Sequence, residues 1–272
     1  MPGSHSPGSH SPGSHAPNGR ATAPLRTAPI WDPPIRAFHW LLVVLLAFSW
    51  WSGEQHDMER HRLSGYAILA LLVFRLIWGV IGPRTARFSS FVRGPRAVIA
   101  YVKDLGSRTG HAADGHNPLG GWSVVAMLLA LAVLVSAGLF ASDVDGLESG
   151  PLAIFVTFEQ SETATEIHEM AFNIVLALVA VHVLAILFYL VWKRQNLIRP
   201  MLTGRRMVEE AEAVADDARE GEGRGGHGIA GSGAAEPASF RWYPLRALVA
   251  VVLAVLVAWA VASAFQFSAA PP

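Results

Sequence analysis

Five long apolar segments alternate with polar stretches along this chain. Each segment is close to the roughly 20 residues that an α-helix needs to cross the hydrocarbon core of a bilayer, and is unusually long and apolar for a soluble core helix. We therefore predict an all-α integral membrane protein. The expected membrane-spanning helices cover Arg36 to Gly53, Leu63 to Ile81, Gly121 to Phe140, Glu166 to Trp192, and Tyr243 to Phe267.

The polar stretches between these helices predict the domain organisation. Residues 1–34 repeat the motif Pro-Gly-Ser-His and cannot bury enough apolar surface to fold, so we expect a disordered His/Pro/Gly/Ser-rich tail. Residues 35–206 contain the first four helices. Residues 207–240 turn acidic and then Gly-rich, which is typical of a flexible linker, and residues 241–268 hold the fifth helix. The expected fold is a four-helix transmembrane bundle with one additional C-terminal transmembrane helix.

The charges of the connecting segments predict the orientation in the membrane. Short loops rich in Lys and Arg stay in the cytoplasm. We expect a multi-pass protein of the bacterial inner (plasma) membrane, with a cytoplasmic N-terminal tail and linker and a periplasmic C-terminus. The expected cytoplasmic segments carry Arg20, Arg26, Arg36, Arg84, Arg87, Arg93, Arg96, Lys103, Arg108, Lys193, Arg194, Arg199, Arg205 and Arg206, and the longer outer loop carries Asp143, Asp145, Glu148, Glu159 and Glu162 without a basic residue.

The composition agrees with a membrane protein and excludes several kinds of site. Charged residues make up 15% of the chain and apolar residues 52%, whereas soluble domains average about 25% charged residues. The absence of cysteine excludes disulfides, iron–sulfur clusters, thioether-attached haem and thiolate zinc sites. The net charge of zero gives no reason to expect a nucleic-acid partner. No hydrolase motif is present, and we assign no catalytic residue.

Four histidines lie in or at the ends of the predicted membrane helices: His39, His61, His168 and His182. Ionisable residues are costly in the membrane and usually serve a function there. The two in the fourth helix are fourteen residues apart, so they lie about 21 Å apart along the axis and only about 40° apart around it. By depth, His168 shares the outer level with His61, and His182 shares the inner level with His39.

Two histidines from facing helices provide the axial ligands that a haem iron needs, one on each side of the ring. Zinc prefers about four ligands around one centre and fits two separated pairs less well. We therefore predict two haems b, held by the pairs His39/His182 and His61/His168. The alternative for any single histidine is a polar residue hydrogen-bonded to a neighbouring helix.

Two further residues are candidates for cofactor binding. Gly65 lies one turn after His61 and would let a flat ring approach the backbone, although close helix packing would also favour a glycine. Arg75 lies fourteen residues after His61, near the inner level. It could pair with a haem propionate or position a quinone, and the alternative is a side chain that extends toward the cytoplasm.

Several short motifs around these residues resemble the bacterial cytochrome b561 family, which includes the cytochrome b subunits of nickel–iron hydrogenases. The resemblance covers about Ile30 to Arg206 and implies a four-helix core with two haems b that moves electrons in the respiratory membrane, with all four family ligand positions occupied. The motifs are Ala37-Phe38-His39-Trp40, His61 with Gly65-Tyr66, Phe74-Arg75-Leu76-Ile77-Trp78-Gly79, Ile167-His168-Glu169 and Val181-His182-Val183.

The function favoured by these observations is a transmembrane electron carrier, with quinone oxidoreductase activity as the associated reaction. It would move electrons between quinone and a periplasmic cytochrome or a membrane partner such as a dehydrogenase subunit, and the acidic outer loop would dock a basic partner. Membrane lipid is the expected surrounding, and a homodimer remains open. One alternative is a haem-bearing anchor subunit of a dehydrogenase or hydrogenase-type complex. A second is a haem-free proton-coupled transporter that uses the same histidines.

Overall fold

The computed structural model describes residues 25–103, 117–143, 148–209 and 243–268. The described residues between 28 and 206 and between 243 and 268 form one compact unit, and the described residues 25–27 and 207–209 belong to another. Within the second of these units, the described residues are parts of two short strands that pair with each other, β1 (Leu25–Pro29) and β2 (Arg205–Glu209). Most of the predicted tail and linker lies outside the described residues.

Among the described residues, five helices are long and apolar enough to cross a membrane, which confirms the predicted all-α membrane fold. They are α1 (Pro33–Glu54), α2 (Met58–Ile81), α5 (Pro118–Phe140), α6 (Phe158–Val191) and α10 (Tyr243–Ser268). The apolar pattern of the sequence does not predict the shorter elements, which are β1, β2, α3 (Phe88–Phe91), α4 (Pro95–Lys103), α7 (Ile198–Thr203) and a 3₁₀ turn at Ala153–Phe155.

Helices α1, α2, α5 and α6 begin before their apolar stretches because polar residues cap their first turns. The Asp32 carboxylate accepts a hydrogen bond of 2.8 Å from the Ile35 N–H and so caps α1. Thr157 and Gln160 form a reciprocal capping box, so that α6 begins eight residues before the predicted Glu166. Side-chain acceptors at these positions satisfy N–H groups that have no partner within the helix.

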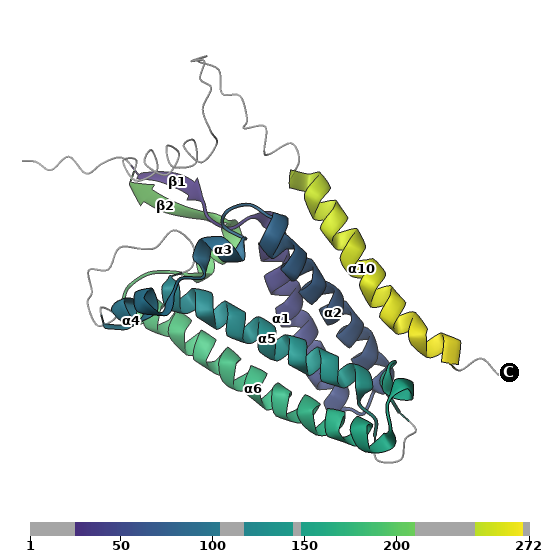
Figure 1. Ribbon diagram of the computed structural model, residues 1–272. Coiled ribbons are helices and arrows are strands. Elements are labelled where there is room, and N and C mark those ends of the chain that lie inside the picture. The colour runs from purple at the N-terminus through teal and green to yellow at the C-terminus, as the bar shows by residue number, and fades with distance from the viewer. Residues whose placement is uncertain (1–24, 104–116, 144–147, 210–242, 269–272) are drawn as a thin grey trace, which may run out of the picture. The chain divides into compact units, whose positions relative to one another are not determined.

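Helices α1, α2, α5 and α6 form the four-helix bundle, and α10 packs along α2 (Figure 1). One apolar cluster joins α2, α5 and α6 in the middle of the bundle, with Ile68, Leu131 and Val175 among its buried members. On α10, Ala250 and Ala254 are 0% and 1% exposed. Small side chains at this spacing let two helices approach closely. Most other apolar residues of α10 are exposed, as expected where a helix meets lipid.

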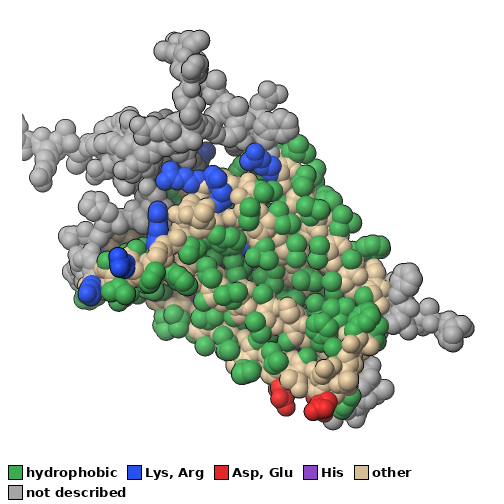
Figure 2. All heavy atoms as spheres, in the orientation of Figure 1, with side chains coloured by type: hydrophobic (Ala, Val, Ile, Leu, Met, Phe, Trp, Pro, Cys, Tyr) green, Lys and Arg blue, Asp and Glu red, His purple; other side chains and the backbone are tan. Residues whose placement is uncertain are grey.

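On the face that Figure 2 shows, basic side chains gather at one end of the bundle and acidic side chains at the other. We call the end where α1 begins and α2 ends the basic end, since Arg36, Arg84, Arg87, Lys193 and Arg199 lie in the segments there. The opposite end, where α1 ends and α6 begins, is the acidic end. Two arginines there, Arg60 and Arg62, pair with Asp57 and Glu148 and are outnumbered by the carboxylates. The carboxylates are those of Glu54, Asp57, Glu59, Glu148, Glu159 and Glu162.

Polar side chains fasten the helices at both ends. At the acidic end, the Ser161 hydroxyl donates a hydrogen bond of 2.6 Å to the Phe140 carbonyl, which satisfies an acceptor at the end of α5. At the basic end, Arg36 of α1 donates hydrogen bonds to the carbonyl oxygens of Met201 and Leu202 in α7. These contacts fix one end of α1 and the facing ends of α5 and α6.

Candidate functional site

His61 and His168 face each other at the acidic end of the bundle. His61 lies in the first turn of α2, and His168 lies eleven positions into α6. Their ring centroids are 6.0 Å apart, and the ring planes are inclined by 80°. Both side chains are half-buried.

In both rings, Nδ1 forms a hydrogen bond to a backbone carbonyl of a neighbouring helix. His61 Nδ1 lies 2.9 Å from the Ser49 carbonyl oxygen of α1, and His168 Nδ1 lies 2.8 Å from the Leu134 carbonyl oxygen of α5. A carbonyl oxygen only accepts, so each Nδ1 carries the proton and donates. In a neutral imidazole this tautomer leaves the lone pair on Nε2.

His39 and His182 lie toward the basic end, on α1 and α6, and are close enough to interact electrostatically. The ring of His39 packs edge-on against that of Trp40, with 5.0 Å between the centroids. His39 Nδ1 is buried and has no hydrogen-bond partner among the described residues. The two histidine pairs therefore differ in how their rings are held.

The donor set fits a haem iron better than a metal ion that needs a cluster of ligands. Two imidazoles on opposite sides of a metal, with bonds of about 2.0–2.1 Å and about 1.1 Å from nitrogen to ring centre, have centroids about 6.3 Å apart. The 6.0 Å between His61 and His168 is close to that separation. Among the described residues, no group of three His, Cys, Asp or Glu side chains could hold a metal ion.

The structure places the other two predicted residues in different surroundings. A Cβ atom built on Gly65 would meet nothing within 4 Å, so close helix packing does not account for this glycine. Arg75 is 3% exposed, donates a hydrogen bond of 3.1 Å from Nη1 to the Ala86 carbonyl, and lies 4.5 Å from the centroid of the Phe88 ring. Its guanidinium is therefore held by the segment that follows α2.

Asp32, the cap of α1, lies in the same region as Arg75. It accepts hydrogen bonds from the Ile35 N–H and from Trp78 Nε1, the latter at 3.3 Å. Burial raises the pKa of Asp32 above its ordinary 3.8, and these hydrogen bonds, together with Tyr243 and the charge of Arg75, offset part of that rise. Asp32 was not among the predicted site residues, although Asp before Pro-Pro is a recognisable helix start.

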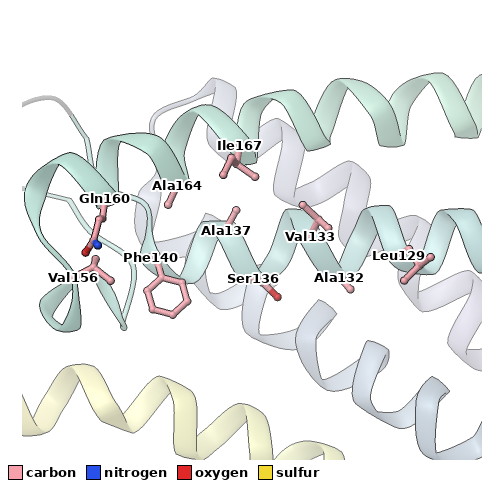
Figure 3. A pocket seen from close by; sticks show the side chains of 10 residues that line it. All are labelled: Leu129, Ala132, Val133, Ser136, Ala137, Phe140, Val156, Gln160, Ala164 and Ile167. Carbon is pink, nitrogen blue, oxygen red and sulfur yellow. The ribbon is translucent and has the colours of Figure 1, made fainter.

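A groove of about 540 Å³ lies between α5 and the first turns of α6 (Figure 3). Ser136 and Gln160 are the polar residues among the ten that line it. None of the four histidines lines this groove.

Comparison with known proteins identifies one family. Residues 30–204 match the family described as prokaryotic cytochrome b561, which confirms the resemblance drawn from the motifs. No curated protein and no solved structure matches the chain.

Proposed function

The chain belongs to the prokaryotic cytochrome b561 family, whose members are membrane cytochromes that carry haem b and transfer electrons, and on this premise we propose that it conducts electrons across the membrane between its two histidine pairs. The observation that carries the proposal is the arrangement of His61 and His168, which face each other at 6.0 Å with both Nδ1 atoms bonded to backbone. Such bonds leave Nε2 of each ring as the coordinating nitrogen.

In this proposal His61 and His168 hold one haem b, and His39 and His182 hold the second. Haem, when bound, supplies an iron that gains and loses one electron. The histidines fix the depth of each group, about 21 Å apart from the helical rise between His168 and His182. The open space beside Gly65 leaves room for a flat ring near His61.

Arg75 is proposed to face an anionic or polar group at the basic end. Its bond to Ala86 uses one N–H of a guanidinium that has five such donors. A haem propionate or a quinone carbonyl are the groups of suitable chemistry. Since the Arg75 guanidinium contacts both the Ala86 carbonyl and the Phe88 ring, its orientation would be set before such a group binds.

We propose that the basic end faces the cytoplasm, because Lys and Arg are retained on that side. The acidic end would then face the periplasm. Its carboxylates suit a partner with a basic surface, such as a small soluble cytochrome, and quinone would exchange electrons at the basic end. If this docking is correct, electron transfer to a basic cytochrome slows as ionic strength rises.

The experiment is a reduced-minus-oxidised spectrum with haem quantification on detergent-purified protein, for the wild type, His61→Ala and His182→Ala. We expect two haems per chain in the wild type and the loss of one in each variant. The control is His56→Asn, which changes an exposed histidine of the α1–α2 turn. Asparagine is chosen because His56 has a left-handed φ of 56° that alanine disfavours.

The outcome also separates the proposal from its alternatives. A colourless wild type that folds when haem is in ample supply would refute it and favour a haem-free proton relay through the same histidines. Two haems with no electron transfer unless a second protein co-purifies would instead indicate an anchor subunit of a larger complex.

A further inference from the structure

Two glycines, one on each neighbouring helix, face the histidine rings of the acidic-end pair. A Cβ atom built on Gly138 of α5 would lie 2.8 Å from His168 Nδ1 and 2.9 Å from its Cε1. A Cβ atom built on Gly53 of α1 would lie 3.2 Å from His61 Nδ1. A side chain at either position would therefore crowd a histidine ring, severely at Gly138 and mildly at Gly53.

Each glycine has the same position in its helix relative to the carbonyl that accepts the histidine's hydrogen bond. Gly138 is four residues after Leu134, and Gly53 is four residues after Ser49. In an α-helix the carbonyl of one residue points toward the N–H of the residue four positions on. An imidazole from another helix can reach that carbonyl only if the side chain at the fourth position does not cover it. A missing Cβ provides this opening in both cases.

We propose that Gly53 and Gly138 are positioning residues for the acidic-end haem site: each opens a backbone carbonyl to the Nδ1–H of one axial histidine. The inference rests on the proposed function, because it assigns His61 and His168 as ligands. It adds that the tautomer and the orientation of both rings are set by the neighbouring helices α1 and α5. Neither glycine touches the iron-binding nitrogen.

These hydrogen bonds also make the two haem sites unequal. An imidazole that donates its second N–H to a carbonyl is a more basic ligand, and such outer bonds tune the reduction potential of the metal. A more basic ligand favours ferric iron and lowers that potential. The acidic-end pair has two such bonds, whereas His39 Nδ1 at the basic end is buried and has no hydrogen-bond partner among the described residues. The acidic-end haem is therefore the one with the lower potential.

The two glycines predict effects of different size. The 2.8 Å approach at Gly138 is about 0.6 Å short of the 3.4 Å at which ordinary van der Waals contact begins, so an alanine there must displace the His168 ring from the Leu134 carbonyl. The 3.2 Å approach at Gly53 is only about 0.2 Å short, and a small tilt of the His61 ring can absorb it.

The test is a spectroscopic redox titration of the full-length protein purified with its haems, for the wild type, Gly138→Ala and Gly53→Ala. Gly94→Ala is the matched control, because a Cβ at Gly94 would meet nothing within 4 Å. We expect Gly138→Ala to raise the potential of the lower-potential haem, or to weaken its binding by about 10–100-fold, as is typical when an outer-shell partner of a metal ligand is lost. Gly53→Ala should shift the same haem in the same direction by less, and the other haem should titrate as in the wild type.

Each result bears on a different claim. Two haems in the wild type with unchanged potentials in both glycine variants would overturn the inference and leave the proposed function intact. A shift of the higher-potential haem instead would overturn the ranking of the two potentials, because the glycine variants act on the acidic-end site whose hydrogen bonds the structure shows. A wild type without haem would refute the proposed function itself. If Gly138→Ala does not fold, the milder Gly53→Ala decides the question.

Discussion

Replacing Arg75 by methionine tests how far one buried guanidinium stabilises the basic end of the bundle. The substitution keeps a long side chain but removes the charge, the hydrogen bond to the Ala86 carbonyl and the contact with the Phe88 ring. Ala86 is 1% exposed, so its carbonyl would lose its donor where water does not easily replace it.

The magnitude follows from these contacts. A buried acceptor left without its donor costs about 1–3 kcal/mol, and a desolvated cation–π contact contributes about 2 kcal/mol. Removing the guanidinium also removes the cost of burying a charge, which offsets part of this loss. The two losses sum to about 3–5 kcal/mol, and with this offset we expect Arg75→Met to lower the free energy of unfolding by about 2–3 kcal/mol. At about 2–4 °C per kcal/mol, the melting temperature should fall by roughly 4–12 °C.

The assay is thermal unfolding in detergent, with the haem spectrum recorded on the same sample. Leu76→Met is the control, because Leu76 is the next residue of α2 and 54% exposed, and the swap nearly conserves volume. Arg75→Lys, which keeps the charge, should melt between the wild type and Arg75→Met. If Arg75→Met melts within about 1 °C of Leu76→Met, the contacts of Arg75 do not stabilise the fold as inferred from the structure. Selective loss of the basic-end haem would add support for the proposed binding role.

Three further substitutions test other parts of the structure. Because burial raises the pKa of Asp32, the wild type should lose stability as the pH rises from about 3.8 through the folded-state pKa. Asp32→Asn still caps α1 and should remove that loss. The melting temperature of the variant minus that of the wild type should therefore grow between about pH 4 and about pH 8. Ala250→Leu should lower the melting temperature by the equivalent of about 1–3 kcal/mol, because Ala250 is 0% exposed against α2, whereas Val251→Leu, at a position 46% exposed, should not. Ser161→Ala should cost about 1–3 kcal/mol in a denaturation measurement, since it leaves the Phe140 carbonyl at the end of α5 without the hydroxyl that bonds it; an unchanged midpoint would show that this carbonyl finds another partner.

The sequence by itself determined the five membrane helices and the depths of the four histidines. Both follow from local quantities: the length of an apolar stretch is matched to the thickness of the hydrocarbon core, and the helical rise converts the spacing of His168 and His182 into a depth difference. The early start of α6 could also have been predicted, because Thr157 and Gln160 form a recognisable capping box. The pattern of apolar residues alone missed it because the first turns of α6 are polar.

The tertiary structure decided which groups surround those histidines. The Nδ1 atoms of His61 and His168 reach the carbonyls of Ser49 and Leu134 because of the way α1 and α5 are rotated against α2 and α6. Residue spacing within one helix carries no information about that rotation. For the same reason Gly138, an isolated glycine in an apolar helix, acquires a role only once His168 is seen to lie against it. The packing of α10 on α2 was likewise open, because a helix with apolar residues on every side does not reveal which face meets protein and which meets lipid.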